Sequence, residues 1–588
     1  MWNSEFHIPK NKEVGVIRKG WRGRLRIALV YPNLYRVGMA SLGFQTVYAL
    51  FNEIDSVVCE RFFLAPQAKP YSRVRLQSSE SGKPLTAFDI IAFSLSFEND
   101  YPNLLTILDT ARIPLQANDR DSSYPLIIAG GVACFLNPEP LAAFIDCFLL
   151  GEAEELIPAF IAACEQTNYF NTPPVKSSQY GKKAKLRFLA DSANNVPGFY
   201  APLLYETDYK ADQTIKSFHT QDSSSGAPAS IIRQYSRDLN CFSTCSAIVS
   251  REAAFSNTYL IEIGRGCPHG CRFCSAGFIY RPPRFRASAH LNQNIASGMT
   301  MTDKIGLLGA AVSDLPEISQ LCAYAIRNNT SLSFSSLRAD AITPALTQAM
   351  RHSGVKTATI APDAGSERMR RVINKGITET DILSATEKFV KNGILNLKLY
   401  FMVGLPTETT DDVEAIADLC LKIKAVFLES SRANKRIGEI TVSLNAFTPK
   451  PFTPFQWVSM DTTRLLKSKI RRIRKRLQRI DNIRLQVNSL RHAYLQALLS
   501  RGDRRVSKIL LSACKNRWNW PKTFKETPIH PDFFSLRERP QNERLPWDFI
   551  DHGISKTFLR NEYKRALQAK TTVPCPMQDC HQCGVCKK

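Results

Sequence analysis

The sequence lacks any uninterrupted apolar run of about 18 residues, the least that a membrane-spanning helix needs. Its longest apolar stretches, around Ile90–Phe97 and Leu141–Leu150, are broken by polar residues within a strand or helix length. Met1–Arg26 alternates charged and polar side chains and has neither an apolar core nor a small-residue cleavage site, so export is not expected. We therefore expect a cytoplasmic protein without membrane association.

Acidic residues are nearly absent from one region. The whole chain has 77 Lys and Arg against 53 Asp and Glu, a net charge of +24, and residues 464–508 hold fifteen basic residues against Asp481 and Asp503 alone. Seven of the ten residues of Lys467–Arg476 are basic. This charge favours a polyanionic partner, and we expect contact with RNA or the ribosome. The alternative is a helix face that is merely solvated.

Disulfides are not expected, because sixteen cysteines in a reducing cytoplasm are better explained as thiolate ligands and buried apolar residues. Seven of them form two tight clusters near residues 270 and 580. Seven others stand alone among apolar neighbours, which predicts core positions. These are Cys59, Cys134, Cys147, Cys164, Cys322, Cys420 and Cys514.

At 588 residues the chain is too long for one core, and about three or four domains are expected. The first 165 residues alternate apolar strand-like runs with helix-period segments, which predicts a doubly wound, Rossmann-like parallel α/β sheet. Ligands collect at the carboxyl ends of the strands in such sheets. The predicted strands are Leu25–Val30, Val57–Leu64, Asp89–Phe97, Leu126–Ala129 and Phe144–Leu149.

Residues 166–250 are rich in Pro, Ser and Gly and are interpreted as a connecting region. Residues 251–460 repeat a strand and a helix six times, which predicts a partial (β/α)6 barrel of the TIM type. Residues 461–565 are predicted to be a basic helical region, and 566–588 a cysteine-rich tail. The expected barrel strands are Tyr259–Ile263, Ile305–Leu308, Leu332–Ser335, Thr357–Ile360, Leu395–Met402 and Glu439–Leu444.

The strongest motif is a Cys-x3-Cys-x2-Cys sequence made of Cys267, Cys271 and Cys274, directly after a predicted strand. Three thiolates on one short loop can hold three irons of a [4Fe–4S] cluster and leave the fourth iron open for chemistry. Zinc is the alternative, and it would need a fourth nearby ligand such as His269.

With aromatic Phe273 before its last cysteine and a barrel downstream, this motif resembles the radical S-adenosylmethionine (SAM) superfamily. The resemblance implies that the three cysteines bind the [4Fe–4S] cluster and that its open iron chelates SAM. It also implies reductive cleavage of SAM to a 5′-deoxyadenosyl radical. The protein then supplies orientation and exclusion of water.

Further segments match the superfamily less specifically and imply cofactor contacts. Gly309 occupies the turn that holds the amino group of SAM, although the second glycine and the acid of that turn are missing here, and Glu408 lies one place later than the family pattern. Each polar residue has the alternative of a surface loop ion pair. The implied cofactor-binding residues are Phe273, Gly309, Ser336, Arg338, Ser366, Glu367 and Gly404.

A narrower resemblance rests on Pro32–Met39, Pro138–Pro140, Gly151–Glu155 and Pro449–Trp457. These segments are similar to cytosolic radical SAM proteins with an N-terminal domain of the B12-binding type. No histidine lies between Ile8 and Phe218, so cobalamin with a histidine axial ligand from this domain is excluded. Base-off cobalamin without a protein ligand and a vestigial sheet that acts as a lid are the alternatives, and we favour a sheet that is vestigial or leaves the cobalt unligated.

The tail offers four thiolates, Cys575, Cys580, Cys583 and Cys586, within twelve residues. This spacing suits zinc or a second iron–sulfur cluster, and the redox motif upstream favours the cluster. Free thiols in a disordered tail are the alternative.

Together these features predict a cytoplasmic radical SAM enzyme that modifies its substrate by hydrogen abstraction, with RNA or a ribosomal component as the expected substrate. An electron donor such as flavodoxin or ferredoxin is implied. One alternative is cobalamin-assisted methylation or rearrangement of a small molecule. Another is a nonenzymatic iron–sulfur protein that binds RNA or transfers electrons.

Overall fold

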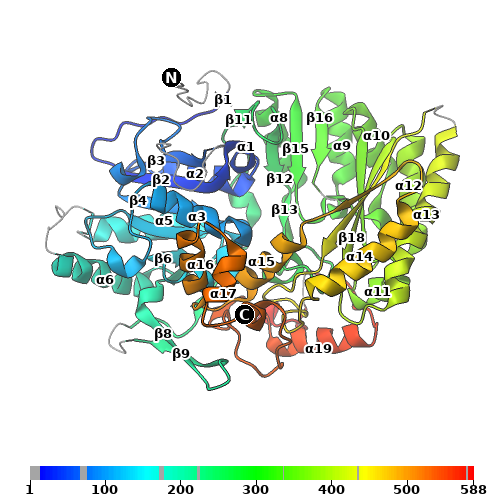
Figure 1. Ribbon diagram of the computed structural model, residues 1–588. Helices are drawn as coiled ribbons and strands as arrows, with labels where there is room; N and C mark the ends of the chain where they lie inside the picture. Colours follow the sequence, from blue (N-terminus) through cyan, green and yellow to red (C-terminus); the bar gives the residue numbers. More distant parts are fainter. Residues whose placement is uncertain are drawn as a thin grey trace, which may run out of the picture.

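The structure is a computed structural model that describes residues 13–65, 76–167, 169–170, 178–221, 226–335, 337–432, 436–577 and 580–587. It is a mixed α/β fold in which an N-terminal sheet and a second group of parallel strands lie side by side (Figure 1). Helices near the C-terminus lie against both parts.

The N-terminal sheet has the strand order β3-β2-β4-β5-β6-β7, parallel except for β7. Ile27–Val30 in its second strand is at most 1% exposed, as expected for a parallel strand covered on both faces. All five strands predicted from the sequence are present. They are β2 (Leu25–Leu34), β3 (Val57–Leu64), β4 (Ile90–Ser94), β5 (Leu126–Gly130) and β6 (Cys147–Leu149), followed by the short β7 (Phe199–Tyr200).

Helices cover this sheet and bring their N-terminal ends to its carboxyl edge. Helices α2 (Leu42–Glu53) and α5 (Ala153–Gln166) pack against each other, while α3 (Tyr101–Thr110) contacts β2 and the C-terminal helix α16 (Val506–Lys515). The seven isolated cysteines are all buried, which confirms their prediction as core residues.

The parallel strands of the second half form two groups, β12-β15-β16 and β17-β18-β19-β20. All six predicted strands are confirmed, and helices such as α12 (Glu379–Lys391) and α13 (Thr410–Ser431) connect them. The region predicted as helical adds a further parallel strand, because Ile483–Val487 alternates apolar and polar side chains. The strands are β12 (Tyr259–Glu262), β15 (Lys304–Leu308), β16 (Ser331–Phe334), β17 (Thr357–Asp363), β18 (Asn396–Val403), β19 (Ile440–Ala446) and β20 (Ile483–Val487).

The connecting region carries structure of its own. It contains helix α6 (Ser178–Asn195), the hairpin β8 (Tyr205–Tyr209) and β9 (Ile215–Thr220), and β11 (Val249–Ser250), which pairs with β1 (Glu13–Val14). No helix among the described residues is long and apolar enough to cross a membrane.

The C-terminal helices tie the two halves together. Asn137 of the N-terminal part donates to the carbonyl oxygens of Ser500 and Gly502, at 3.0 and 2.7 Å. Arg504 pairs with Glu139 at 2.9 Å. The helices are α14 (Thr463–Leu477), α15 (Leu490–Arg501), α16, α17 (Trp520–Glu526), α18 (Asp532–Ser535) and α19 (Lys556–Leu567).

Candidate active site and metal centres

The cysteine loop, Cys267–Cys274, follows β13 (Gly264–Arg265) and ends just before helix α7 (Ala276–Ile279). Gly266 enters the loop with a φ of +84°, and a Cβ there would lie 2.6 Å from the carbonyl oxygen of Tyr280. A side chain at this position would therefore meet both backbone strain and a steric clash. The tight turn brings the three cysteines together on one loop.

The three thiols lie within electrostatic reach of one another. Burial, and then the Cys271 thiol, raises the pKa of Cys267 to about 12. Burial also raises the pKa of Cys271 to about 11, while the positive charges of Lys375 and Arg338 lower it. No three Cys, His, Asp or Glu side chains in the described part of the chain converge on a single metal ion. The three free thiols of this loop can each bind a different iron, so the donor set fits a [4Fe–4S] cluster.

Two cations that act on Cys271, Lys375 and Arg338, are each paired with a carboxylate near the cysteine loop. Lys375 Nζ lies 2.6 Å from the Asp363 carboxylate at the end of β17. Arg338 donates to the carbonyl oxygen of Lys375 at 3.1 Å and pairs with Asp340 at 3.0 Å. These positive charges favour thiolates at the cysteine loop. Arg338 was predicted from the sequence as a cofactor contact, whereas Lys375 and Asp363 were not, although Asp363 follows shortly after the predicted strand Thr357–Ile360, where site residues collect.

A chamber of about 410 Å³ opens between the two sheets. Its N-terminal wall is the carboxyl edge of the first sheet, with Gly130 and Gly131 after β5 and the start of α2. Its other wall includes Gly266, which directly precedes the cysteine loop, and Gly309, which follows β15. The chamber lies where ligands bind in open α/β sheets, and its lining is mainly apolar.

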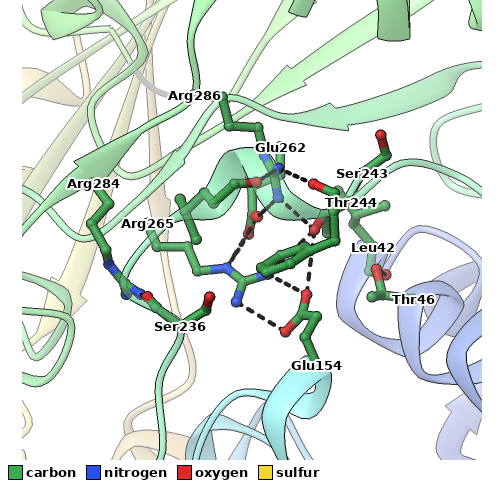
Figure 2. Close-up of polar contacts among 12 residues, drawn as sticks. Leu42, Thr46, Glu154, Ser236, Ser243, Thr244, Glu262, Arg265, Arg284 and Arg286 are labelled. Carbon is green, nitrogen blue, oxygen red and sulfur yellow. Dashed lines mark hydrogen bonds and ion pairs between the residues drawn. The ribbon is translucent and has the colours of Figure 1, made fainter. Parts of the chain in front are cut away.

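An arginine network at the wall of the chamber joins the two halves, and Figure 2 shows its centre. Arg265, directly before the cysteine loop, pairs with Glu262 at 2.9 Å, with Glu154 at 2.6 Å and with Glu152 at 2.7 Å. Arg284 lies 2.6 Å from Glu152. The strand that leads into the cysteine loop is thereby fixed to the start of α5.

The network favours the charged forms of Glu152 and Arg265 although both are buried. Burial would raise the pKa of the Glu152 carboxyl, but the hydrogen bond from Arg284 and the charge of Arg265 outweigh it and lower that pKa. Burial would lower the pKa of Arg265, but Glu262, Glu154 and Glu152 hold it well above its usual value. Gly151–Glu155 supported the family resemblance, but nothing in the local sequence indicated its arginine partners.

Two family models match this chain. The model described as "Radical SAM superfamily" matches residues 261–420, and the one described as "Radical SAM proteins, N-terminal" matches residues 43–202. An uncharacterized protein of Methanocaldococcus jannaschii is 30% identical over 487 residues, which is 82% of this chain and 90% of that protein. The chain belongs to the radical SAM superfamily. Membership implies a [4Fe–4S] cluster and SAM.

Solved structures of radical SAM enzymes also align with it. The radical SAM methyltransferase TsrM of Kitasatospora setae, with tryptophan substrate and a SAM analog bound, aligns at 12% identity and a TM-score of 0.48, over 85% of this chain and 98% of that one. SuiB of Streptococcus suis bound to SAM aligns at 12% identity and a TM-score of 0.28, over 40% of this chain and 51% of that one.

The residues expected from the superfamily pattern to contact cofactors differ from one another in their surroundings. Gly309 lines the chamber, and its N–H donates to Ser335 Oγ at 3.1 Å. Phe273 is half-buried against the core, and Ser336 lies outside the described residues. The N–H of Gly404, which has a φ of +86°, donates to the Glu408 carboxylate at 2.8 Å.

Ser366 and Glu367 have structural partners. Ser366 accepts from the N–H of Met369 as the N-cap of α11 (Glu367–Val372) and donates to Asp412 at 2.6 Å. The Glu367 side chain is 53% exposed and lies 3.7 Å from Arg370. Neither residue lines the chamber. Both environments resemble the alternative of a loop contact more than a cofactor contact.

The basic helix α14 buries Leu466, Ile470, Ile473 and Leu477 at the predicted helical spacing. Part of its charge is already neutralised by acidic residues of the same chain. Lys469 lies 2.8 Å from both Glu408 and Asp461, Arg472 lies 3.3 Å from Glu414, and Arg476 lies 2.5 Å from Asp418. The remaining cations of Lys467–Arg476 are exposed, and they are Lys467, Arg471, Arg474 and Lys475.

Proposed function

We propose that this protein is an enzyme that cleaves SAM reductively at a [4Fe–4S] cluster held by Cys267, Cys271 and Cys274, and abstracts hydrogen from a substrate bound in the chamber. When bound, the cluster and SAM supply the one-electron chemistry and the 5′-deoxyadenosyl radical. One observation carries the proposal. The same chamber is lined by Gly264–Gly266, which lead into the cysteine loop, and by the carboxyl edge of the N-terminal sheet.

The protein's own residues would orient the reactants and exclude water. The backbone around Gly309 forms the chamber wall at the end of β15, where no side chain restricts approach. Arg265, Glu154 and Glu262 offer charged groups in fixed positions, since each is held by the arginine network. The apolar remainder of the wall suits a reaction in which bulk water must be kept from a radical.

The chamber supports a small molecule, or a single projecting group, as the substrate. Helix α14 contributes no residue to the chamber lining, and three of its cations pair within the chain. An RNA or ribosomal substrate held by the charge of α14 would therefore have to extend beyond this helix to reach the chamber. The four exposed cations of α14 remain the feature that supports such a partner.

SAM cleavage is the direct test. Anaerobically reconstituted protein should release 5′-deoxyadenosine from SAM after reduction with dithionite. Cys271→Ala should reduce this release to background, because one of three cluster ligands is lost. Cys241→Ser, an exposed cysteine outside both clusters, is the control and should retain wild-type release. Undiminished release by Cys271→Ala would contradict the proposal, as would no release by wild-type protein with a full complement of iron.

Cobalamin-assisted methylation is a second candidate because the chamber occupies the carboxyl edge of a B12-type sheet. The protein would be reconstituted with hydroxocobalamin, desalted and examined for corrinoid absorbance. Retention in the wild type and its loss in Leu42→Trp, which adds bulk at the chamber wall, would support this function. Leu465→Trp, at an exposed position on α14, is the control. Absence of retained absorbance in the wild type would reject this candidate and leave the first unaffected.

A further inference from the structure

The cysteine tail, Cys575–Cys586, folds back onto the cysteine loop. The N–H of Cys575 donates to the carbonyl oxygen of Pro268, inside the loop, at 2.8 Å. Cys575 and Cys580 also border a small hollow together with Gly270 of the loop and Arg281. Residues about 300 positions apart are therefore in direct contact, which the sequence could not indicate.

Two buried polar side chains hold this arrangement. Arg272, which is 0% exposed and lies between two cluster cysteines, donates to the Lys570 carbonyl oxygen at 2.8 Å and pairs with Glu562 at 3.1 Å. Asn374 donates to the carbonyl oxygens of Gly270 and Thr572, both at 3.2 Å, and accepts from the Thr572 N–H at 2.8 Å. Each of these residues bridges the cysteine loop and the segment that precedes the tail. Buried hydrogen bonds and an ion pair therefore specify the contact between the cysteine loop and the segment that precedes the tail.

The four thiols of the tail are near one another. The Cys586 thiol interacts electrostatically with those of Cys583, Cys575 and Cys580. Cys583 is 3% exposed, and its carbonyl oxygen accepts the Ser555 N–H at 2.9 Å. The other three are half-buried. The described residues of the tail are therefore packed against the rest of the chain, and their four thiols lie near one another.

We propose that Cys575, Cys580, Cys583 and Cys586 bind a second [4Fe–4S] cluster, which receives electrons for the neighbouring catalytic site. Four thiolates satisfy all four irons, so such a cluster has no open site for chemistry and serves electron transfer. The half-buried thiols leave the centre accessible from solvent.

The electron-transfer role of the tail cluster rests on the proposed function. The proposal that the tail binds a cluster depends only on the four tail cysteines and their surroundings. A reduced ferredoxin or flavodoxin would lose one electron to the tail cluster and become oxidised, and that electron would move on toward the cysteine loop. No bond is made or broken and no proton moves in this step. The contact between Cys575 and Pro268 keeps the path between the two sites within the protein.

The metal site is tested without any activity measurement. The variant carrying Cys267→Ala, Cys271→Ala and Cys274→Ala lacks the catalytic ligands and, after anaerobic reconstitution, should hold about four irons and about four sulfides per chain. Reduction with dithionite should give an electron paramagnetic resonance signal of a [4Fe–4S] cluster. Finding no iron, or a single zinc per chain, in folded protein would overturn the proposal.

The reciprocal variant has serine at all four tail positions and tests the role. It should lose about half of the roughly eight irons of the wild type, while Cys241→Ser should lose none. Its SAM cleavage should fall at least about tenfold with reduced flavodoxin but much less with dithionite, which can reach the loop directly. An equal fall with both reductants would reject the electron-transfer role. Because tail substitutions could unfold the segment, single Cys586→Ser protein should be compared with wild type by thermal unfolding and iron content.

Discussion

Arg265 and Glu154 lie 111 positions apart in the sequence, yet their side chains meet at 2.6 Å across the wall of the chamber. Glu154 starts a helix of the N-terminal half, and Arg265 ends the strand that enters the cysteine loop. The position of the loop is therefore coupled to the N-terminal sheet through buried charges. This coupling means that the two halves form one site rather than two independent domains.

Substitution of Arg265 should lower the stability of the fold. Arg265→Ala takes the cation from buried Glu154, and the free energy of unfolding should fall by about 3–5 kcal/mol, although Glu152 keeps Arg284 and Glu262 keeps Arg286. Urea titration measures this loss. Arg187→Ala, in an exposed pair 3.8 Å from Asp191, is the control and should change stability by less than about 1 kcal/mol. Equal effects of the two substitutions would show that the network does not stabilise the fold.

Gly266→Ala should lower the iron content of the catalytic site. The added methyl group would lie 2.6 Å from the Tyr280 carbonyl oxygen, so the turn into the cysteine loop must shift. Gly354→Ala is a matched control, since Gly354 also has a positive φ of +65° but no atom lies within 4 Å of its new Cβ. Both variants should lose about 1 kcal/mol to backbone strain. Only Gly266→Ala should lose iron after reconstitution, and wild-type iron in that variant would contradict the assigned role of the turn.

Asp100 should make stability depend on pH. Burial raises its pKa from 3.8 to about 6, against the hydrogen bonds from Asn33 and Asn103 that lower it. The folded state therefore binds the proton more tightly than the unfolded state, so this residue's contribution to stability decreases as the pH rises from about 4 to about 6. At pH 7 the cost is up to about 3 kcal/mol.

Asp100→Asn should abolish this dependence, because the amide keeps an oxygen that can accept from Asn33 but does not ionise. The variant should be more stable than wild type at pH 7 and about equal to it at pH 4, as measured by urea titration at both values. Asp109→Asn, at an exposed position of α3, is the control and should follow the wild type. A wild-type pH dependence in Asp100→Asn would assign the effect to other groups.

Substitution of two neighbouring lysines of α14 should have different effects on thermal stability. Lys469 joins Glu408 and Asp461, both at 2.8 Å, whereas Lys467 is exposed. Lys469→Ala leaves buried Glu408 without its cation and should lower thermal stability, while Lys467→Ala should leave it unchanged. Differential scanning fluorimetry can compare them.

Substitution of the exposed cations of α14 can distinguish a small-molecule substrate from RNA. Changing Lys467, Arg471, Arg474 and Lys475 to alanine should leave SAM cleavage unchanged if the substrate is a small molecule in the chamber. Filter binding of RNA across a salt series is the measurement for the other class. Wild-type binding with a steep negative salt slope, flattened in the fourfold variant, would identify RNA as a partner and contradict the proposed small-molecule substrate.

The prediction from sequence succeeded where the signal is local. The segment Ile27–Val30 is apolar throughout because both faces of its strand are covered, and the helix around Ile470 and Ile473 shows its buried face at helical spacing. The strand Ile483–Val487 was missed because its exposed residues, Arg484 and Gln486, are as polar as those of the basic helix before it. Ser366, a candidate cofactor contact, caps α11 by accepting from the Met369 N–H, and it donates to Asp412, a distant partner that the sequence could not indicate.

The sequence by itself determined the cysteine loop, because three thiols within eight residues must lie close together whatever the rest of the chain does. It also determined most of the strands and helices, since burial of one face imposes its period on the residues. The tertiary structure alone decided the chamber, the pairing of Arg265 with the start of α5, and the contact of the tail with Pro268. Those features join residues separated by roughly 100 to 300 positions, and only packing of the whole chain specifies which distant groups become neighbours.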